Sequence, residues 1–163
     1  MARDERDMRI RKGQACGAFW KMKNIWQARN IPLELKIRIF KASCLAILLY
    51  GSETWALTTK MKSSLDSYAT SCYRVMLNIK RIDHVTNEAI YQRVKQPPLS
   101  SLVVKRQLTW VGHILRRPKE ELIRKYAMYE PGVQMGKSKR GKKELIYKKY
   151  IIDLLSHSTE FQL

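Results

Sequence analysis

The feature that most constrains the fold is the spacing of apolar residues between Thr58 and Ile79. They recur every three or four positions along the whole stretch: Met61, Leu65, Tyr68, Ala69, Cys72, Val75, Met76 and Ile79. Polar side chains fill the positions between them, so a helix here has one apolar face and one polar face. Thr58 or Thr59 can cap its first turn. The stretch therefore predicts an amphipathic helix that packs one face on a core.

The same helical spacing recurs along the rest of the chain, where proline and glycine separate the segments. We expect further helices over residues 2–29, 32–49, 87–95, 100–116, 120–129 and 144–155. Thr86 is placed to cap the helix over 87–95, with Val85 and Ile90 as a hydrophobic staple. A weak extended piece around 54–57 is the nearest approach to a strand. The prediction is an all-α fold of about six helices in an irregular bundle.

Residues 131–143 differ from the helical segments. They contain three glycines, no large core residue except Met135, and five basic residues, which are Lys137, Lys139, Arg140, Lys142 and Lys143. Such a composition is typical of an exposed, mobile loop. We therefore expect a basic, flexible C-terminal arm, followed by the helix over 144–155 and a frayed end from residue 156.

The segment 32–49 changes character along its length. Its first half is amphipathic, whereas residues 44–50, CLAILLY, are apolar on every side. A helix of this kind must be buried all round or covered by a partner. We therefore expect that this segment and the helix over 2–29 leave exposed apolar patches, with self-association and limited solubility as the result.

Charge points to the kind of partner. Lys and Arg number 32 against 14 acidic residues, a formal net charge of +18 in a chain of 163 residues. That excess predicts a polyanionic partner, with nucleic acid as the first candidate and an anionic membrane surface as the second. The longest apolar run, around residues 46–50, is too short to span a bilayer.

Neither a metal site nor a catalytic centre emerges from the residue pattern. Three cysteines lie far apart without a CxxC pair, and no histidine stands beside them at ligand spacing. An odd cysteine count without a signal peptide favours a reducing, intracellular setting, nucleus or cytoplasm. The acids are scattered among basic residues, whereas metal-assisted phosphoryl transfer needs clustered carboxylates. We expect no cofactor and no enzymatic activity from this chain alone.

The best binding candidate is the basic, partly aromatic stretch 105–117, KRQLTWVGHILRR. As a helix it aligns Arg106, Trp110, His113 and Arg117 on one stripe, with Lys105 and Arg116 beside it. Phosphate attracts the basic residues, and the face of Trp110 can stack on a base. In the alternative interpretation, Trp110 belongs to the core and the arginine stems lie over it. On the opposite side we expect an apolar face of Val104, Leu108, Val111 and Leu115.

Four runs, in this order, carry a resemblance to a known family: LLYGSETWALT (48–58), SYATSCYRVMLNI (67–79), HVTNEAI (84–90) and KRQLTWVGHILRR (105–117). Together they resemble the C-terminal part of the endonuclease–reverse transcriptases of non-LTR retrotransposons, over about residues 9–155. The family often continues with Gly-Arg-Pro, then a Trp and an Asp. Here Gly141–Lys142–Lys143, Tyr147 and Asp153 take those places, so the proline and the tryptophan are missing.

The resemblance implies a division of the chain. Residues 1–30 correspond to the last palm helix, 31–80 to thumb helices, 81–130 to a helical connector, and 131–163 to a basic loop and C-terminal helix. The family's RNA-directed DNA polymerase activity needs two adjacent palm aspartates, and this chain has no Asp–Asp pair. The resemblance thus implies a truncated fragment that grips template–primer, RNA or RNA–DNA duplex, through its backbone without reading sequence.

The residues expected to contact nucleic acid come from the stripe and from the C-terminal loop. They are Lys105, Arg106, Trp110, His113, Arg116, Arg117, Lys137, Lys139, Arg140, Lys142 and Lys143. An alternative hypothesis remains open: a stand-alone basic helical module that binds a protein or a membrane surface, with no enzymatic activity.

Overall fold

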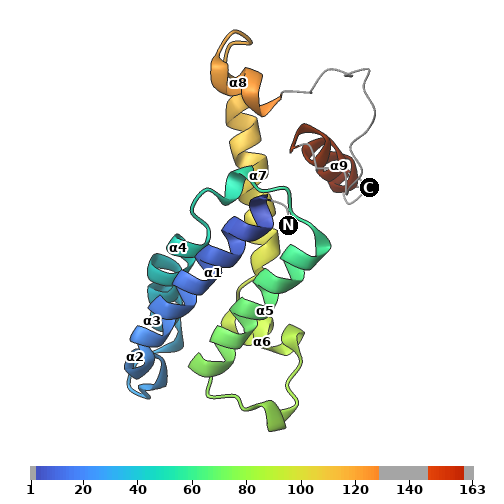
Figure 1. The fold of residues 1–163 in the computed structure, drawn as a ribbon. Helices are drawn as coiled ribbons and strands as arrows, with labels where there is room; N and C mark the ends of the chain where they lie inside the picture. Colours follow the sequence, from blue (N-terminus) through green and yellow to red (C-terminus); the bar gives the residue numbers. More distant parts are fainter. Residues whose placement is uncertain (1–2, 129–146, 160–163) are drawn as a thin grey trace.

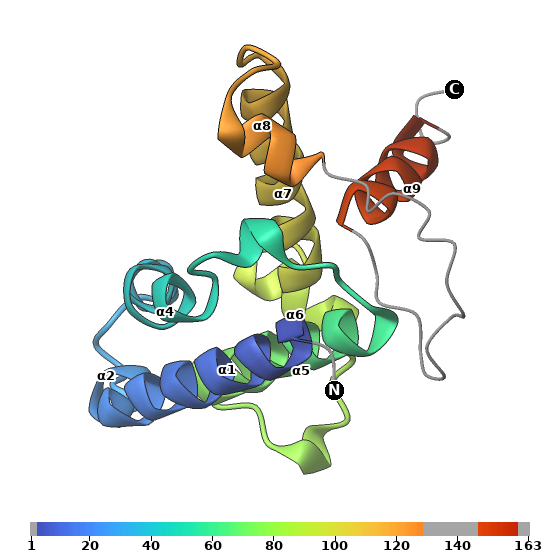
Figure 2. The ribbon, with the colours of Figure 1, turned by 45° about the horizontal axis from the view of Figure 1, so that its top comes forward.

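The computed structural model describes residues 3–128 and 147–159, and every regular element in these two ranges is helical (Figure 1). The all-α prediction is confirmed. Most helices pack into one body with a single hydrophobic core. One long helix, α7 (Leu99–Leu115), extends out of this body and carries the short α8 (Leu122–Ala127) at its far end (Figures 1 and 2).

The first expected helix is broken in two. α1 (Arg3–Lys21) and α2 (Lys23–Gln27) are separated by Met22, whose backbone leaves the helical region. The cause is Trp26, which is fully buried, stacks on the Phe19 ring with 5.0 Å between centroids, and donates its indole N–H to the Phe19 carbonyl at 2.6 Å. A straight helix would carry Trp26 away from that carbonyl, so the chain bends to bring the indole back.

The apolar segment is mostly buried, so the expected exposed patch is confirmed only in part: Tyr50 at its end is 71% exposed, and Ile10 and Trp20 of α1 are each 51% exposed. α3 (Leu33–Phe40) runs through a π-helical segment η1 (Lys41–Leu45) into α4 (Ala46–Leu48). Cys44, Leu45, Leu48 and Leu49 are all buried in the common core, where η1 and α4 pack on α1. The helix over residues 3–21 supplies part of the cover that the apolar segment needs.

Both predicted threonine caps are confirmed. The Thr58 hydroxyl accepts a hydrogen bond from the Met61 amide at 3.2 Å and starts α5 (Thr59–Met76). Thr86 does the same for the Ala89 amide at 3.3 Å and starts α6 (Asn87–Val94). In each case a side-chain oxygen satisfies an N–H group that the first turn leaves without a helical partner.

α7 has no cap of its own, since Pro98 precedes it. Asp66 of α5 serves instead: its carboxylate accepts the Ser100 amide at 2.8 Å and the Ser100 hydroxyl at 2.7 Å. A negative charge is favourable at the N-terminus of a helix, so this contact fixes the root of α7 on α5.

The remaining elements are short or lie at the C-terminus. Residues 54–57 contain no strand; 3₁₀ turns occupy Ser52–Thr54 and Arg81–Asp83. The last helix, α9 (Tyr147–Thr159), continues beyond the expected end at residue 155 and lies beside α7 (Figure 1).

Candidate nucleic-acid interface

The orientation of α7 decides which of its side chains can meet a ligand. Its buried face consists of Leu99, Val103, Gln107, Val111 and Ile114. The sequence-based assignment of this face was therefore wrong except at Val111: Leu115 is 47% exposed, and Val104 and Leu108 are only partly buried. Gln107 is polar but buried, so it hides the true buried face from an analysis of apolar spacing. The spacing therefore predicted the neighbouring face of the helix instead.

Gln107 is the centre of a buried polar cluster. Its side-chain amide nitrogen donates to the Ser52 carbonyl at 3.1 Å and to the Trp55 carbonyl at 2.7 Å. Its amide oxygen accepts the Tyr150 hydroxyl of α9 at 2.8 Å. Buried polar groups need such partners, and this one residue ties α7 to the 52–55 turn and to α9.

The same turn is held from its other side by α1. Asp7 accepts the Trp55 indole N–H at 3.0 Å, and Asp4 accepts the Ala56 amide at 2.9 Å. The mixed charges at the start of the chain thus include two acids with a structural role. From the sequence, these residues were assigned only a position on a helix. Their partners lie about 50 residues away in the chain, and no neighbouring residue indicates the contact.

Most of the expected stripe is engaged within the protein. Arg106 donates to the Leu49 carbonyl at 3.3 Å and lies 3.8 Å from the Glu53 carboxylate. Trp110 is partly buried and meets the Tyr147 ring edge-on, with 5.8 Å between centroids. This geometry favours the interpretation in which Trp110 packs within the protein.

The far end of α7 is also internally bonded. Arg116 donates to Nδ1 of the exposed His113 at 2.7 Å, and Arg117 pairs with Glu121 at 2.9 Å. Arg124 of α8 donates to the backbone carbonyls of Leu115 and Arg117, which holds α8 against the end of α7. Lys105 is exposed and makes no side-chain hydrogen bond or ion pair in the described part of the chain.

We call the outer side of α7 and α8 the α7–α8 surface. Its cationic residues are Lys105, Arg106, Arg116, Arg117, Lys119, Arg124 and Lys125. Glu120 and Glu121 are the acids within residues 105–125. The surface is therefore strongly positive even where single arginines are paired. The predicted contacts Lys137, Lys139, Arg140, Lys142 and Lys143 lie outside the described residues.

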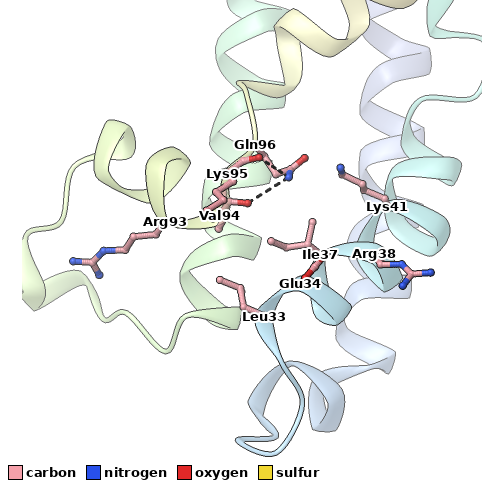
Figure 3. A pocket seen from close by; sticks show the side chains of 9 residues that line it. All are labelled: Leu33, Glu34, Ile37, Arg38, Lys41, Arg93, Val94, Lys95 and Gln96. Atoms are coloured by element: carbon pink, nitrogen blue, oxygen red, sulfur yellow. Dashed lines mark hydrogen bonds between the residues drawn. The ribbon is translucent and has the colours of Figure 1, made fainter.

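A second cationic site lies where sequence reasoning placed none. A cavity of about 410 Å³ opens between α3 and the end of α6 (Figure 3). We call it the α3–α6 pocket; its lining residues are Leu33, Glu34, Ile37, Arg38, Lys41, Arg93, Val94, Lys95 and Gln96. Its basic residues, Arg38 and Lys41 on one wall and Arg93 and Lys95 on the other, belong to no sequence motif, and only the fold brings them together.

Burial changes the acid–base behaviour of two tyrosines beside α7. Burial raises the pKa of Tyr150 to about 12, and it raises the pKa of Tyr147 further still. Tyr147 donates its hydroxyl to the Glu53 carbonyl at 2.7 Å. Both tyrosines therefore act as neutral donors that dock α9.

Two further features bear on function. Within residues 3–128 and 147–159, His, Cys, Asp and Glu side chains nowhere gather in a group of three or more that could hold a metal ion. Over the same ranges, no helix has both the length and the apolar character that crossing a bilayer requires.

Comparison with known proteins found no matching family model, no matching curated protein and no matching solved structure. The geometry and charge of the chain itself therefore carry the functional argument.

Proposed function

We propose that this chain binds the phosphate backbone of nucleic acid, RNA or an RNA–DNA duplex, without reading base sequence. The single observation that supports this most strongly is a net charge of +18 on a helical fold with a well-packed core. A protein with this charge repels itself unless a polyanion is present, and neutralised phosphates release counterions that favour binding.

The distribution of acidic residues strengthens the argument. Asp4, Asp7 and Asp66 are occupied by hydrogen bonds that hold backbone or side chains inside the fold. These acids do little to offset charge on the α7–α8 surface, where Lys105, Lys119 and Lys125 have no side-chain partner among the described residues and stand beside arginines. Contacts of this kind fix a protein on a duplex but carry no sequence information.

The state of Trp110 favours backbone contact over base contact. Its ring meets Tyr147 edge-on, so one edge of the stripe is already covered by α9. A base-stacking platform needs a free aromatic face. The α7–α8 surface is therefore proposed to act through Lys105, Lys119 and Lys125 together with the arginine heads.

We further propose that the chain corresponds to the thumb and connector of a non-LTR retrotransposon reverse transcriptase. The runs that carry the resemblance contact one another in the fold. Gln107 of the fourth run bonds the first run at Ser52 and Trp55, and Arg74 of the second bonds Val85 of the third at 3.0 Å. Since the chain has no Asp–Asp pair, we propose nucleic-acid binding and no polymerase activity.

A salt titration of binding to a nonspecific RNA–DNA duplex tests the proposal. Each phosphate contact contributes a slope of roughly −0.9 in log K against log salt for B-DNA, so several contacts give a steep loss of affinity. The double variant Lys105→Glu/Lys119→Glu should flatten the slope and weaken binding. Lys21→Glu/Lys23→Glu makes the same charge change near the junction of α1 and α2, away from α7 and α8 (Figure 1), and should have a smaller effect. A flat slope for the wild-type protein would contradict the proposal.

Exposed apolar side chains on α8 favour a second candidate, a membrane-surface role. Leu122, Ile123 and Tyr126 are 68%, 44% and 76% exposed, and Arg124 and Lys125 lie among them. Such a surface suits an anionic bilayer. Co-sedimentation with phosphatidylserine vesicles tests it: Leu122→Ser/Tyr126→Ser should abolish vesicle binding and leave duplex binding intact.

A further inference from the structure

The α3–α6 pocket combines an apolar floor with a cationic rim. Ile37 and Val94 are buried at 6% and 3% exposure, and Leu33 completes the apolar part. Figure 3 shows Lys41 and Gln96 directed toward one another across the hollow, whereas Arg38 and Arg93 extend outward on opposite sides. A group that enters the hollow would thus meet Lys41 first, whereas the guanidinium groups of Arg38 and Arg93 are directed away from it.

The positive charge of this pocket exceeds the negative charge of its lining. Among the residues that the structure describes, Arg38, Lys41, Arg93 and Lys95 make no ion pair and no side-chain hydrogen bond. Glu34 is the acidic residue of the lining. The lining therefore carries an excess of positive charge, which an anion bound in the cavity would offset.

The C-terminal end of α6 would normally disfavour an anion, because a helix ends with free carbonyl oxygens. Here Gln96 donates its side-chain amide to the Val94 and Lys95 carbonyls at 3.3 and 2.6 Å. Two carbonyl oxygens at the end of the helix are thereby paired, which reduces their repulsion of an anion; Glu34 is the remaining negative group of the lining.

The backbone is irregular on both walls of the pocket. Lys41 begins the π-helical segment η1, and π-helical turns are frequent at functional sites. Lys95 caps α6 in the left-handed region with φ 52°, a position where glycine is the favoured residue. A lysine in this conformation is strained, because its Cβ lies close to the following carbonyl oxygen.

From these observations we infer that the α3–α6 pocket binds the phosphoryl group of a nucleotide, with the sugar or base against the apolar floor. Phosphate matches the cationic rim, and the volume and the floor suit a ligand larger than a bare ion. The phosphoryl group can come from a free nucleotide or from a nucleic-acid strand. This site is separate from the α7–α8 surface and does not rest on the function proposed for it.

Titration of the full chain with adenosine 5′-monophosphate, followed by amide NMR spectra, tests the inference. We expect saturable shifts at Ile37, Lys41 and Gln96, with weaker shifts from inorganic phosphate and none from adenosine. Lys41→Met should weaken the affinity about tenfold, the effect of losing one charged hydrogen bond. Lys21→Met, at the end of α1 and outside the lining of the pocket, should leave the affinity unchanged.

Lys95→Gly separates binding from folding. Glycine relieves the left-handed strain, so this variant should melt at a higher temperature than wild type while it binds adenosine 5′-monophosphate several-fold more weakly. His84→Gly is the matched control, since His84 also has a positive φ of 48° but does not line the pocket. It should raise the melting temperature and leave the affinity unchanged.

A titration with a further ligand, a short oligonucleotide without a terminal phosphate, identifies the source of the phosphoryl group. Shifts of the same pocket amides would assign the site to a strand, and their absence would assign it to free or terminal phosphates. Absence of shifts with adenosine 5′-monophosphate and with the oligonucleotide would overturn the inference. So would unchanged affinity in both Lys41→Met and Lys95→Gly. Duplex binding that is lost in the Lys105→Glu/Lys119→Glu variant, with pocket shifts retained, would show that the two sites are independent.

Discussion

The α7–α8 surface and the α3–α6 pocket are both cationic, but they differ in what their charges already contact. On α7 and α8, Arg106, Arg117 and Arg124 are bonded to Glu53, Glu121 and backbone carbonyls. In the pocket, the four cations make no such bonds in the described part of the chain. The most basic run of the sequence therefore contains side chains that are already bonded, whereas the basic residues of the pocket are not bonded within the described part of the chain.

This difference shows that a basic sequence run reveals how much charge is present, but not whether the charged side chains are free to contact a ligand. An arginine that holds α8 in place can still attract a phosphate at long range, because a hydrogen bond to a carbonyl leaves its charge intact. It cannot reorient toward a ligand without losing that bond. A lysine that has no partner among the described residues, such as Lys105, can do so at no structural cost.

The largest expected effect comes from the anchor of α7. Gln107→Leu removes the partner of the Trp55 carbonyl and the acceptor of the Tyr150 hydroxyl, whereas the Ser52 carbonyl keeps the Trp55 amide. Each buried group without a partner costs about 1–3 kcal/mol, so we expect a loss of at least about 2 kcal/mol in urea unfolding. Gln14→Leu, at an exposed position of α1, should change stability by less than about 0.5 kcal/mol. Similar stability of the two variants would show that α7 is not held by this cluster.

The second-largest expected effect is a loss of folding stability at alkaline pH, caused by Tyr150, which is bonded to Gln107 of α7. The pKa of Tyr150 is about 12 in the folded protein because burial disfavours the charged form. The unfolded chain ionises near pH 10 and the native state does not, so stability is lost as pH rises from about 10 to 12. We expect a loss on the order of 2 kcal/mol from this group, measured by urea unfolding at pH 8 and pH 11.5.

Tyr150→Phe is the control for this pH effect. It should lower stability at pH 8 by about 1 kcal/mol, since the hydrogen bond to Gln107 is lost. Between pH 8 and pH 11.5 it should lose less stability than wild type. An alkaline loss of the same size in both proteins would mean that another group is responsible.

The smallest expected effect comes from Glu121→Gln, which tests the difference between the α7–α8 surface and the α3–α6 pocket. Glu121→Gln releases Arg117 from an exposed i, i+4 ion pair, at a stability cost of about 0.3–0.5 kcal/mol. It also removes a negative charge from the α7–α8 surface. We expect duplex affinity to rise a few-fold at low salt, with nucleotide binding in the α3–α6 pocket unchanged. Unchanged duplex affinity would show that Arg117 lies outside the interface.

Local rules accounted for much of the fold, and distant contacts for the rest. Thr58 and Thr86 were identified as caps because a cap and its helix are adjacent in the chain. The break at Met22 was missed because it depends on an indole reaching back to the Phe19 carbonyl. Gln107 was missed as a buried residue because its partners lie about 50 residues away and on α9.

The candidate sites follow the same division. The stripe on α7 was visible because its residues share one helix, yet its pairing with Glu53 and Tyr147 was not. The α3–α6 pocket was invisible because its two walls come from residues 33–41 and 93–96. Neither wall has an unusual sequence, and only packing of α3 against the end of α6 makes them one site.

Lysine acetylation, read by mass spectrometry with and without a nonspecific RNA–DNA duplex, tests the central claim most directly. The claim is that the backbone of a nucleic acid is bound at the α7–α8 surface, by lysines that have no side-chain partner among the described residues. We predict strong protection of Lys105, Lys119 and Lys125 by the duplex, and little change at Lys21 and Lys23. Equal protection of all five lysines, or protection of none, would contradict the account.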